Sequence, residues 1–394
     1  NEPLDTSAIP RSINNEATKP DHKSAEYTET VARCTGNDRF DAHPQANDWY
    51  ETIKLNYGID YCDWGGRSNH FNPIPDTWHK MTDILLFWAA KGIDGFRCDM
   101  AEMVPHEFWK YATEKVKAQY PHIVFIGEVY DPNQYRTYIA AGFDYLYDKV
   151  GMYDCLRDVM CEHRSANDIT RQWQATDDIS KHVLYFLENH DEQRIASNFF
   201  CGNMQKGIPA LIVAALFQCN PIMIYAGQEF GEKGMDGEGF SGIDGRSTIF
   251  DYWSIDAIRK GFFERSKLSA EQVQLEKEYR KILTLCNSEK AVSEGKTFDL
   301  MYANETNDAF DSNKQFAFLR SSNNTTLLIV ANFSKTEAHI RVNIPAHAFD
   351  YMEIKEGNKN MVDLLSGNHQ SVVLQKDSSI EIVVPALNGR VYKF

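Results

Sequence analysis

The chain has 394 residues, of which 43% are hydrophobic, and a formal net charge of −15. A chain of this length can bury a sizeable core and hold two domains. Its excess of acidic residues excludes a nucleic-acid-binding protein, because such proteins present a basic face to the phosphates. No apolar run reaches the length of about 20 residues that a membrane-spanning helix needs, and we interpret the longest one, residues 208–218, as a buried helix.

The cysteines indicate neither a disulfide scaffold nor a zinc site. Eight cysteines are too few for a scaffold in a chain of this length, and none belongs to a C-x-x-C pair. No cysteines and histidines cluster with the spacing of zinc ligands. We therefore interpret most of the cysteines as buried thiols that pack as small apolar side chains.

Regular secondary structure is predicted only after an irregular start. Residues 1–60 show neither the alternation of a strand nor the period of a helix, and we interpret them as an irregular excursion from the domain that follows. Beyond them, apolar runs that predict strands alternate with helical patterns at spacings typical of βαβ units in a parallel sheet. The predicted strands are 93–98, 123–128, 143–148, 182–188 and 221–227, and the predicted helices are 75–91, 104–120, 133–141, one through 156–159, and 208–217.

The last third of the chain changes character. A Gly-rich loop at 227–253 is followed by an amphipathic helix at 269–286. From residue 287 onward, alternating strands are separated by Asn, Ser and Gly turns, which predicts an antiparallel β-sandwich. The predicted domains are therefore 1–60 (irregular excursion), 61–286 (the C-terminal part of a catalytic barrel) and 287–394 (the β-sandwich).

The predicted strands are too few to close the predicted barrel. A (β/α)8 TIM-type barrel closes with eight parallel strands, and this sequence offers about five. We expect that the N-terminal strands of the barrel lie outside this sequence. The alternative, that another polypeptide supplies them, stays open.

Three predicted strands end in an acid. Arg97 and Asp99 follow one apolar run, Glu128 follows the next, and His190 with Asp191 follows a third. Side chains alternate along a strand, so Arg97 and Asp99 point the same way, at the strand ends where barrel enzymes keep their chemistry. A single acid at such a position is more often a helix cap or an ion-pair partner. The conjunction of three is what favours a site.

Acids converging at one mouth are typical of glycosidic bond cleavage, in which one carboxylate attacks and another protonates the leaving oxygen. Arg97 favours the charged form of a nucleophile at Asp99. We expect burial and nearby negative charge to keep Glu128 protonated as the acid. Asp191 and His190 are then available to hold sugar hydroxyls.

The motifs GFRCD, IGEVY and ENHDEQR resemble the strand-four, strand-five and strand-seven motifs of the α-amylase family of glycoside hydrolases. NPIMIYAGQE is similar to its strand-eight motif, and the β domain to its C-terminal domain. The resemblance implies a retaining enzyme that hydrolyses or transfers α-glucosidic bonds. It implies that Asp99 is the nucleophile, Glu128 the acid/base and Asp191 the transition-state stabiliser, and that Arg97 and His190 bind sugar. Met100, Glu102 and Tyr130, which lie within or beside these motifs, are further substrate-binding candidates.

Two departures from the family pattern stand out. The strand-three motif, an Asp followed by Asn-His, is absent, and its Asn often helps to hold calcium. The Lys-His that often follows the nucleophile is replaced by Met100-Ala101-Glu102-Met103. This second departure resembles the cyclomaltodextrinase and neopullulanase branch, as does the short segment IKLN at 53–56, whose alternative interpretation is an ordinary loop.

The resemblance implies no cofactor for the chemistry and leaves a structural calcium open. Asp236, Glu238 and Asp244 are calcium candidates in the Gly-rich loop, for which a solvated lid is the favoured alternative. Trp49, Tyr50, Tyr61 and Trp64 are expected either to stack on sugar rings or to anchor the irregular excursion.

The predicted function is hydrolysis of starch or maltooligosaccharides, with an α-glucan as the partner and the oligomeric state open. One alternative is a fragment that binds α-glucan without cleaving it because the barrel is incomplete. Another is a transglycosylase or a sucrose-acting relative. The sequence begins at Asn1 rather than at an initiator methionine, and we expect that its start has been lost or processed. The localisation stays open, with export to the periplasm or cell surface favoured slightly over the cytoplasm.

Overall fold

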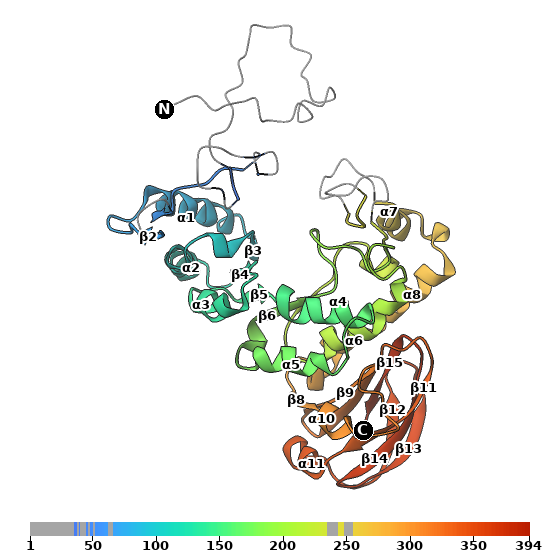
Figure 1. Ribbon diagram of the computed structural model, residues 1–394. Coiled ribbons are helices and arrows are strands. Elements are labelled where there is room, and N and C mark those ends of the chain that lie inside the picture. Colours follow the sequence, from blue (N-terminus) through green and yellow to red (C-terminus); the bar gives the residue numbers. More distant parts are fainter. Residues whose placement is uncertain are drawn as a thin grey trace. The chain divides into compact units, whose positions relative to one another are not determined.

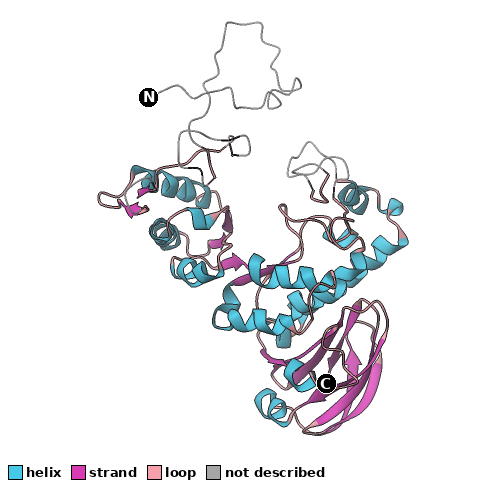
Figure 2. Cartoon of the chain, viewed as in Figure 1, coloured by secondary structure: helices cyan, strands magenta, loops and turns pink. Residues whose placement is uncertain are grey.

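The computed structural model describes residues 35–37, 39, 45, 48–49, 52–61, 66–234, 243–247 and 255–394. Most of the predicted excursion at 1–60 lies outside these ranges. The described chain divides into two units, shown with the rest of the chain in Figures 1 and 2. The first contains the described residues up to Gly95 together with Met103–Ile123, and the second contains Phe96–Glu102 together with the described residues from Val124 to Phe394.

The first unit is built around an aromatic cluster between two helices. Helix α1 (Asp76–Ala89) packs against α2 (His106–Gln119), and each begins directly after a proline, which is favoured at a helix start. The ring of Phe108 lies 4.9 Å from that of Tyr57 and 5.9 Å from that of Trp78, measured between centroids. Both predicted helices are confirmed. A short antiparallel pair, β1 (Ile59–Asp60) and β2 (Ser68–Asn69), completes the unit.

The predicted parallel sheet is present, with five strands among the described residues. Its order is the order of the chain, β3-β4-β5-β6-β7, and the pairings from β4 to β7 are parallel. All four residues of β6 are buried, as expected of a strand inside a barrel wall. Each strand is shorter than predicted: β3 (Gly95–Cys98), β4 (Val124–Gly127), β5 (Tyr145–Tyr147), β6 (Val183–Phe186) and β7 (Ile222–Met223).

The helices of the second unit confirm the pattern and add to it. Helix α6 (Gly207–Leu216) is buried at every position, which its uniformly apolar sequence predicts, and it packs against α8 (Ala270–Ser288). Ser269 and Gln272 form a capping box at the start of α8. The helices α3 (Tyr135–Ala140) and α4 (Asp154–Met160) were predicted, whereas α5 (Asp168–Ala175) and α7 (Asp256–Phe263) were not.

The C-terminal part is antiparallel β structure, drawn mainly as orange-to-red arrows in Figure 1 and as magenta strands in Figure 2. A six-stranded sheet has the order β13-β12-β15-β10-β9-β8, and β11 pairs with β14 in a second sheet. The strands are β8 (Lys296–Asp299), β9 (Gln315–Ser322), β10 (Thr325–Asn332), β11 (Ala338–Ile344), β12 (Gly357–Asp363), β13 (His369–Leu374), β14 (Ser378–Val384) and β15 (Asn388–Lys393), with the short helices α9 (Lys290–Ser293), α10 (Met301–Asn304) and α11 (Ala346–Met352).

The hairpin between β9 and β10 shows how the sequence sets a turn. Asn323 and Asn324 both have positive φ, 51° and 65°, the conformation of a type I′ turn, which asparagine tolerates better than most residues. The register that follows pairs Ser322 with Thr325. The predicted sandwich is confirmed, although β8 and β12 were missed. The domain boundaries at residues 60 and 286 stay predictions.

Candidate active site

Arg97 connects two of the three predicted acids. Its Nη1 contacts Asp99 Oδ1, and its Nη2 lies 3.0 Å from Glu128 Oε2. The backbone N–H of Glu128 donates to the carbonyl of Cys98 at 3.1 Å, so Glu128 leaves β4 level with the end of β3. Two neighbouring strand ends therefore bring two carboxylates to one guanidinium.

The two acidic neighbours of Arg97 keep its guanidinium charged although it is partly buried. Burial lowers the pKa of Arg97, but the hydrogen bond to Asp99 and the charge of Glu128 raise the pKa by more, so that the net direction is upward. The guanidinium also lies 5.8 Å from the ring centroid of Tyr147, within the range of a cation–π contact. The cation is held from three sides.

Glu128 is enclosed, whereas Asp99 is open. Glu128 is 2% exposed, and the side chain of Asp99 is 73% exposed. Glu128 Oε2 accepts a hydrogen bond from the backbone N–H of Met100 at 2.8 Å, and Oε1 accepts one from the Tyr130 hydroxyl at 2.9 Å. Burial of Glu128 was expected, but its direct contact with Arg97 was not.

Met100 contributes to this arrangement through its backbone. Its φ is +43°, an uncommon value for a residue with a side chain and one that often marks a functional site. This conformation accompanies the hydrogen bond from the Met100 N–H to Glu128. A contact of the Met100 side chain with substrate stays a prediction.

The third acid lies on the loop after β6. Asn189 Oδ1 accepts hydrogen bonds from the backbone N–H groups of Asp191 and Glu192, at 2.9 and 2.8 Å. His190 Nε2 lies 3.1 Å from Asp191 Oδ2. This loop follows the strand next but one to β4 in the sheet order.

The pKa values of two tyrosines, Tyr130 and Tyr147, depend on both Glu128 and Asp191. Burial raises the pKa of Tyr130, and the charges of Glu128 and Asp191 raise it further. Burial also raises the pKa of Tyr147, which Arg97 lowers and the charges of Glu128 and Asp191 raise. The charges of Glu128 and Asp191 thus act on the same two phenols, Tyr130 and Tyr147.

Glu102 serves the loop after β4. Its Oε2 accepts hydrogen bonds from the backbone N–H groups of Tyr130 and Asp131, at 3.1 and 3.0 Å. Its carbonyl accepts one from the Tyr138 hydroxyl at 3.1 Å. Glu102 is thus a positioning residue for Tyr130, and its direct contact with substrate stays a prediction.

A charged group next to Asp191 was missed from the sequence. Glu192 accepts a hydrogen bond from the Tyr153 hydroxyl at 3.2 Å and lies 3.2 Å from Lys149 Nζ. The Tyr153 ring stacks on Phe186 with the centroids 4.8 Å apart. The sequence offered two signals: Glu192 stands within the motif ENHDEQR, and Lys149 and Tyr153 follow the end of β5. Both were passed over because Glu192 stands beside the stronger candidates His190 and Asp191, and because β5 ends in aromatic residues.

Of the three calcium candidates in the Gly-rich loop, Asp244 lies within the described residues. Asp236 and Glu238 lie outside the described residues, as do Tyr50 and Trp64 among the aromatic candidates. Asp244 Oδ1 accepts a hydrogen bond from the backbone N–H of Arg246 at 3.0 Å. Within the described ranges, no three His, Cys, Asp or Glu side chains gather as metal ligands would. In the same ranges, no helix combines the length and the apolar character that crossing a bilayer requires.

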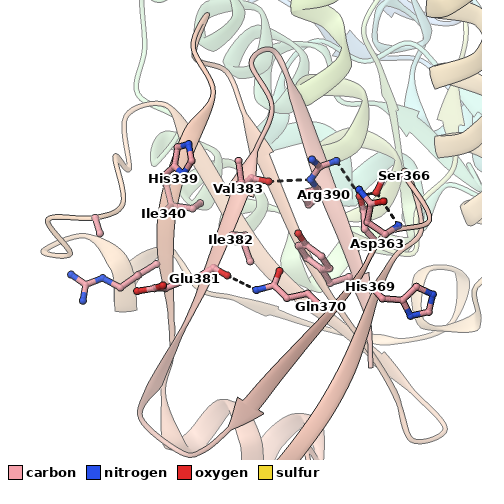
Figure 3. Close-up of a pocket in the computed structure, with 14 residues that line it drawn as sticks. His339, Ile340, Asp363, Ser366, His369, Gln370, Glu381, Ile382, Val383 and Arg390 are labelled. Atoms are coloured by element: carbon pink, nitrogen blue, oxygen red, sulfur yellow. Dashed lines mark hydrogen bonds and ion pairs between the residues drawn. The ribbon is translucent and has the colours of Figure 1, made fainter.

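A cavity of about 670 Å³ lies in the C-terminal β domain (Figure 3). Its polar groups are already engaged with one another: Arg390 lies 3.1 Å from Asp363 and donates to the carbonyl of Val383 at 3.1 Å. Gln370 donates to the carbonyl of Glu381 at 2.7 Å. With Asp363 committed to Arg390, this cavity does not offer the free pair of carboxylates that glycosidic chemistry needs.

Known proteins share both parts of this chain. Residues 73–302 match the family described as "Alpha amylase, catalytic domain", and residues 306–394 match the one described as "Alpha amylase, C-terminal all-beta domain". A crystal structure of an Anoxybacillus alpha-amylase resembles the chain with a TM-score of 0.62 and 18% sequence identity, covering 85% of this chain and 68% of that one. At this identity, the likeness concerns the fold.

Two curated relatives are similar over part of their length. The chain is 32% identical over 92 residues to the alpha-1,4-glucan:maltose-1-phosphate maltosyltransferase of Cereibacter sphaeroides, which covers 22% of this chain and 16% of the relative. It is 23% identical over 300 residues to the cyclomaltodextrinase of Geobacillus thermopakistaniensis (strain MAS1), which covers 74% of this chain and 44% of the relative. The chain therefore spans less than half the length of either relative. Since the match to the catalytic domain extends over more than half of the chain, and the parallel strands occur in the expected order, the chain belongs to the alpha-amylase family.

Proposed function

We propose that the chain carries the active site of a retaining glycoside hydrolase that cleaves α-glucosidic bonds of starch and maltooligosaccharides. The observation that carries the proposal is the bridge from Arg97 to Asp99 and Glu128 at neighbouring strand ends. Retaining enzymes need a nucleophile and an acid/base on one sugar-sized site, at a separation of roughly 5–5.5 Å. The contact of both carboxylates with one guanidinium supports the proposal that they act on the same sugar.

The two carboxylates divide the work by exposure. Asp99, whose side chain is open, attacks the anomeric carbon and forms the glycosyl ester, while Glu128 gives a proton to the leaving oxygen. Glu128 then takes a proton from the water that hydrolyses the ester. Asp191 and His190 hold the sugar hydroxyls as positive charge develops on the ring. These steps need no cofactor, and a structural calcium stays a prediction.

A transferase is the second candidate, and one relative favours it. The glycosyl ester on Asp99 is also the intermediate of transfer, in which a sugar hydroxyl replaces water. A curated relative is named a maltosyltransferase, whereas another is named a cyclomaltodextrinase. We place hydrolysis first because the relative covered over the larger share of this chain is the cyclomaltodextrinase. Binding of glucan without cleavage, transfer from sucrose and export from the cell are further expectations to be tested.

Incubation of the chain with maltoheptaose tests the proposal. We expect shorter maltooligosaccharides whose new reducing ends first appear as the α anomer by proton NMR. Asp99→Asn should lower the rate by about 10³-fold or more, because the nucleophile is lost, while the exposed Asp83→Asn on α1 should leave it unchanged. Equal rates for the wild type and Asp99→Asn contradict the assignment. Heat of maltoheptaose binding without cleavage identifies a binding fragment, and products longer than the substrate identify a transferase.

A further inference from the structure

Two cysteines far apart in the sequence lie against each other. The Sγ atoms of Cys161 and Cys201 are 3.8 Å apart, although 40 positions separate the residues along the chain. Cys161 directly follows α4, and Cys201 lies in the turn before the 3-10 helix Met204–Lys206. Both are free thiols and both are partly exposed, so a small molecule can reach them.

The surroundings of the pair activate one of the two thiols. The hydrogen bond between the two thiols lowers the pKa of Cys161 to about 6, and the neighbouring His163, Lys206 and Arg157 contribute in the same direction. The same contact raises the pKa of Cys201. The thiolate is the reactive form of cysteine, so Cys161 is the attacking group and Cys201 is the partner that follows.

Three of the other described cysteines, Cys98, Cys155 and Cys286, lack this activation. Burial raises the pKa of Cys98 to about 12, and that of Cys155 and of Cys286 to about 11. Thiols buried in apolar surroundings are inert towards small oxidants. The buried thiols therefore serve as internal references: an oxidant that is selective for the Cys161–Cys201 pair should leave them unmodified.

We propose that Cys161 and Cys201 are a redox-sensitive dithiol that small-molecule disulfides, such as oxidised glutathione, convert into an intramolecular disulfide. The Cys161 thiolate attacks one sulfur of oxidised glutathione, which forms a mixed disulfide and releases one glutathione thiolate. Cys201 then loses its proton and attacks the Cys161 sulfur, which releases the second glutathione. Two protein thiols are oxidised, one glutathione disulfide is reduced, and the product is one Cys161–Cys201 bond.

The geometry requires only a small movement. A disulfide bond is about 2.05 Å long, so the two sulfurs approach by roughly 1.8 Å from their present 3.8 Å. The turn that carries Cys201 is anchored at Ser197, whose carbonyl accepts from the N–H groups of Phe200 and Gly202, at 3.0 and 2.7 Å. Gly202 has a φ of +63°, which glycine adopts without strain.

The bond would enclose the segment that carries Asp191. The closed loop runs from residue 161 to 201 and contains α5, β6 and the loop after β6. A cross-link of this span lowers the entropy of the unfolded chain. The consequence is a redox-dependent stability of that segment, and this inference does not depend on the proposed function.

The experiment uses the whole chain with Cys34→Ser and Cys62→Ser, which removes the two cysteines outside the described residues. The protein is equilibrated with mixtures of oxidised and reduced glutathione, alkylated and digested for mass spectrometry. We expect a peptide pair joined through Cys161 and Cys201, with Cys98 and Cys155 alkylated as free thiols. The melting temperature should rise by about 3–6 °C on oxidation and return on addition of dithiothreitol.

Single substitutions separate the two roles. Cys201→Ser should accumulate a stable glutathione adduct on Cys161, whereas Cys161→Ser should leave Cys201 unmodified. Cys155→Ser is the matched control and should form the cross-link as before. The proposal is overturned if the folded protein yields no Cys161–Cys201 peptide in oxidised glutathione, or if Cys98 and Cys155 react as readily as Cys161.

Discussion

At the scale of single residues, Arg97 is the group on which the proposed site depends. Its planar guanidinium contacts Asp99 with one nitrogen and Glu128 with another. A lysine ammonium is a single point charge and cannot reproduce this fork. The bridge therefore predicts that charge alone is insufficient at this position.

Arg97→Lys should lower kcat/KM on maltoheptaose by about 10–100-fold, because one charge-assisted hydrogen bond contributes about 1.5–3 kcal/mol. The circular dichroism spectrum should stay unchanged. Arg171→Lys, at an exposed position of α5, is the matched control and should retain full activity. If both variants keep wild-type kcat/KM, the bridge has no catalytic role.

A second residue, Asp148 at the end of β5, makes the folding stability depend on pH. Asp148 is buried, and burial raises its pKa to about 6, although the backbone N–H of Met152 and the Tyr135 hydroxyl lower it in part. Its ordinary value in an unfolded chain is about 3.9. Between these values the folded protein binds more protons than the unfolded one, so folding stability falls as the pH rises from about 4 to about 6.

Asp148→Asn should remove this dependence. Relative to wild type, the variant should gain up to about 3 kcal/mol in unfolding free energy between pH 4 and pH 7.5, since one pKa unit corresponds to about 1.4 kcal/mol. Urea unfolding at the two pH values measures the difference, and Asp83→Asn, at an exposed site, should show none. Parallel pH profiles for wild type and Asp148→Asn would contradict the assignment.

The sequence predicted these residues unevenly, for a physical reason. Asp99, Glu128 and Asp191 were predicted because each follows an apolar run, which is a local pattern. The bond from the Met100 N–H to Glu128 was not, because it accompanies a backbone φ of +43° at Met100. The use of Glu102 on the backbone of Tyr130 depends on the packing of two loops, which no pattern within either loop records.

At the scale of elements, the loop after β6 is held by a buried ion pair. Arg194 Nη1 lies 2.7 Å from Glu188 Oε2, and both residues are buried. Glu188 Oε1 accepts from the backbone N–H of Ile195 at 2.8 Å, while Arg194 also donates to Ser247 Oγ at 2.7 Å. The two ends of the loop that carries His190 and Asp191 are thus joined below it.

Arg194→Met should destabilise the protein by about 3–5 kcal/mol, because it leaves the Glu188 carboxylate buried without its partner. The double variant Glu188→Gln/Arg194→Met should lose less, since no uncompensated charge remains. Urea unfolding measures both losses, and hydrogen exchange at 189–193 shows whether the loop opens. A double variant that is less stable than Arg194→Met would argue against a charge-pairing role.

The elements that the sequence predicted are those with strong apolar patterns. All five strands of the parallel sheet and the buried helix α6 were found in this way. Strand β12, with the sequence GNKNMVD, and helix α5, with DITRQWQA, were missed because polar residues dominate both. Their conformations come from pairing with β13 and from packing against α4, which are contacts with other elements rather than features of their own sequences.

At the scale of the whole second unit, one buried arginine joins the parallel sheet region to the β domain. Arg320 on β9 is fully buried. It donates to the carbonyls of Ala291, Val292 and Gly295 at 3.0, 2.6 and 3.1 Å, and also to the carbonyl of Phe217 at the end of α6. Among the described residues, none of its hydrogen-bond acceptors is a carboxylate. The charge is therefore stabilised by backbone dipoles that come from both sides of the junction.

Arg320→Met should destabilise the protein by about 3–5 kcal/mol, because several buried carbonyls lose their donor at once and each costs about 1–3 kcal/mol, less what water recovers. The unfolding free energy of Arg320→Lys should fall between those of the wild type and Arg320→Met, since one ammonium reaches fewer of the acceptors. Limited proteolysis should cut the variants earlier than wild type between α8 and β9, where the junction opens. The exposed Arg341→Met on β11 is the control. If Arg341→Met and Arg320→Met show the same unfolding free energy and the same cleavage, Arg320 does not hold the junction.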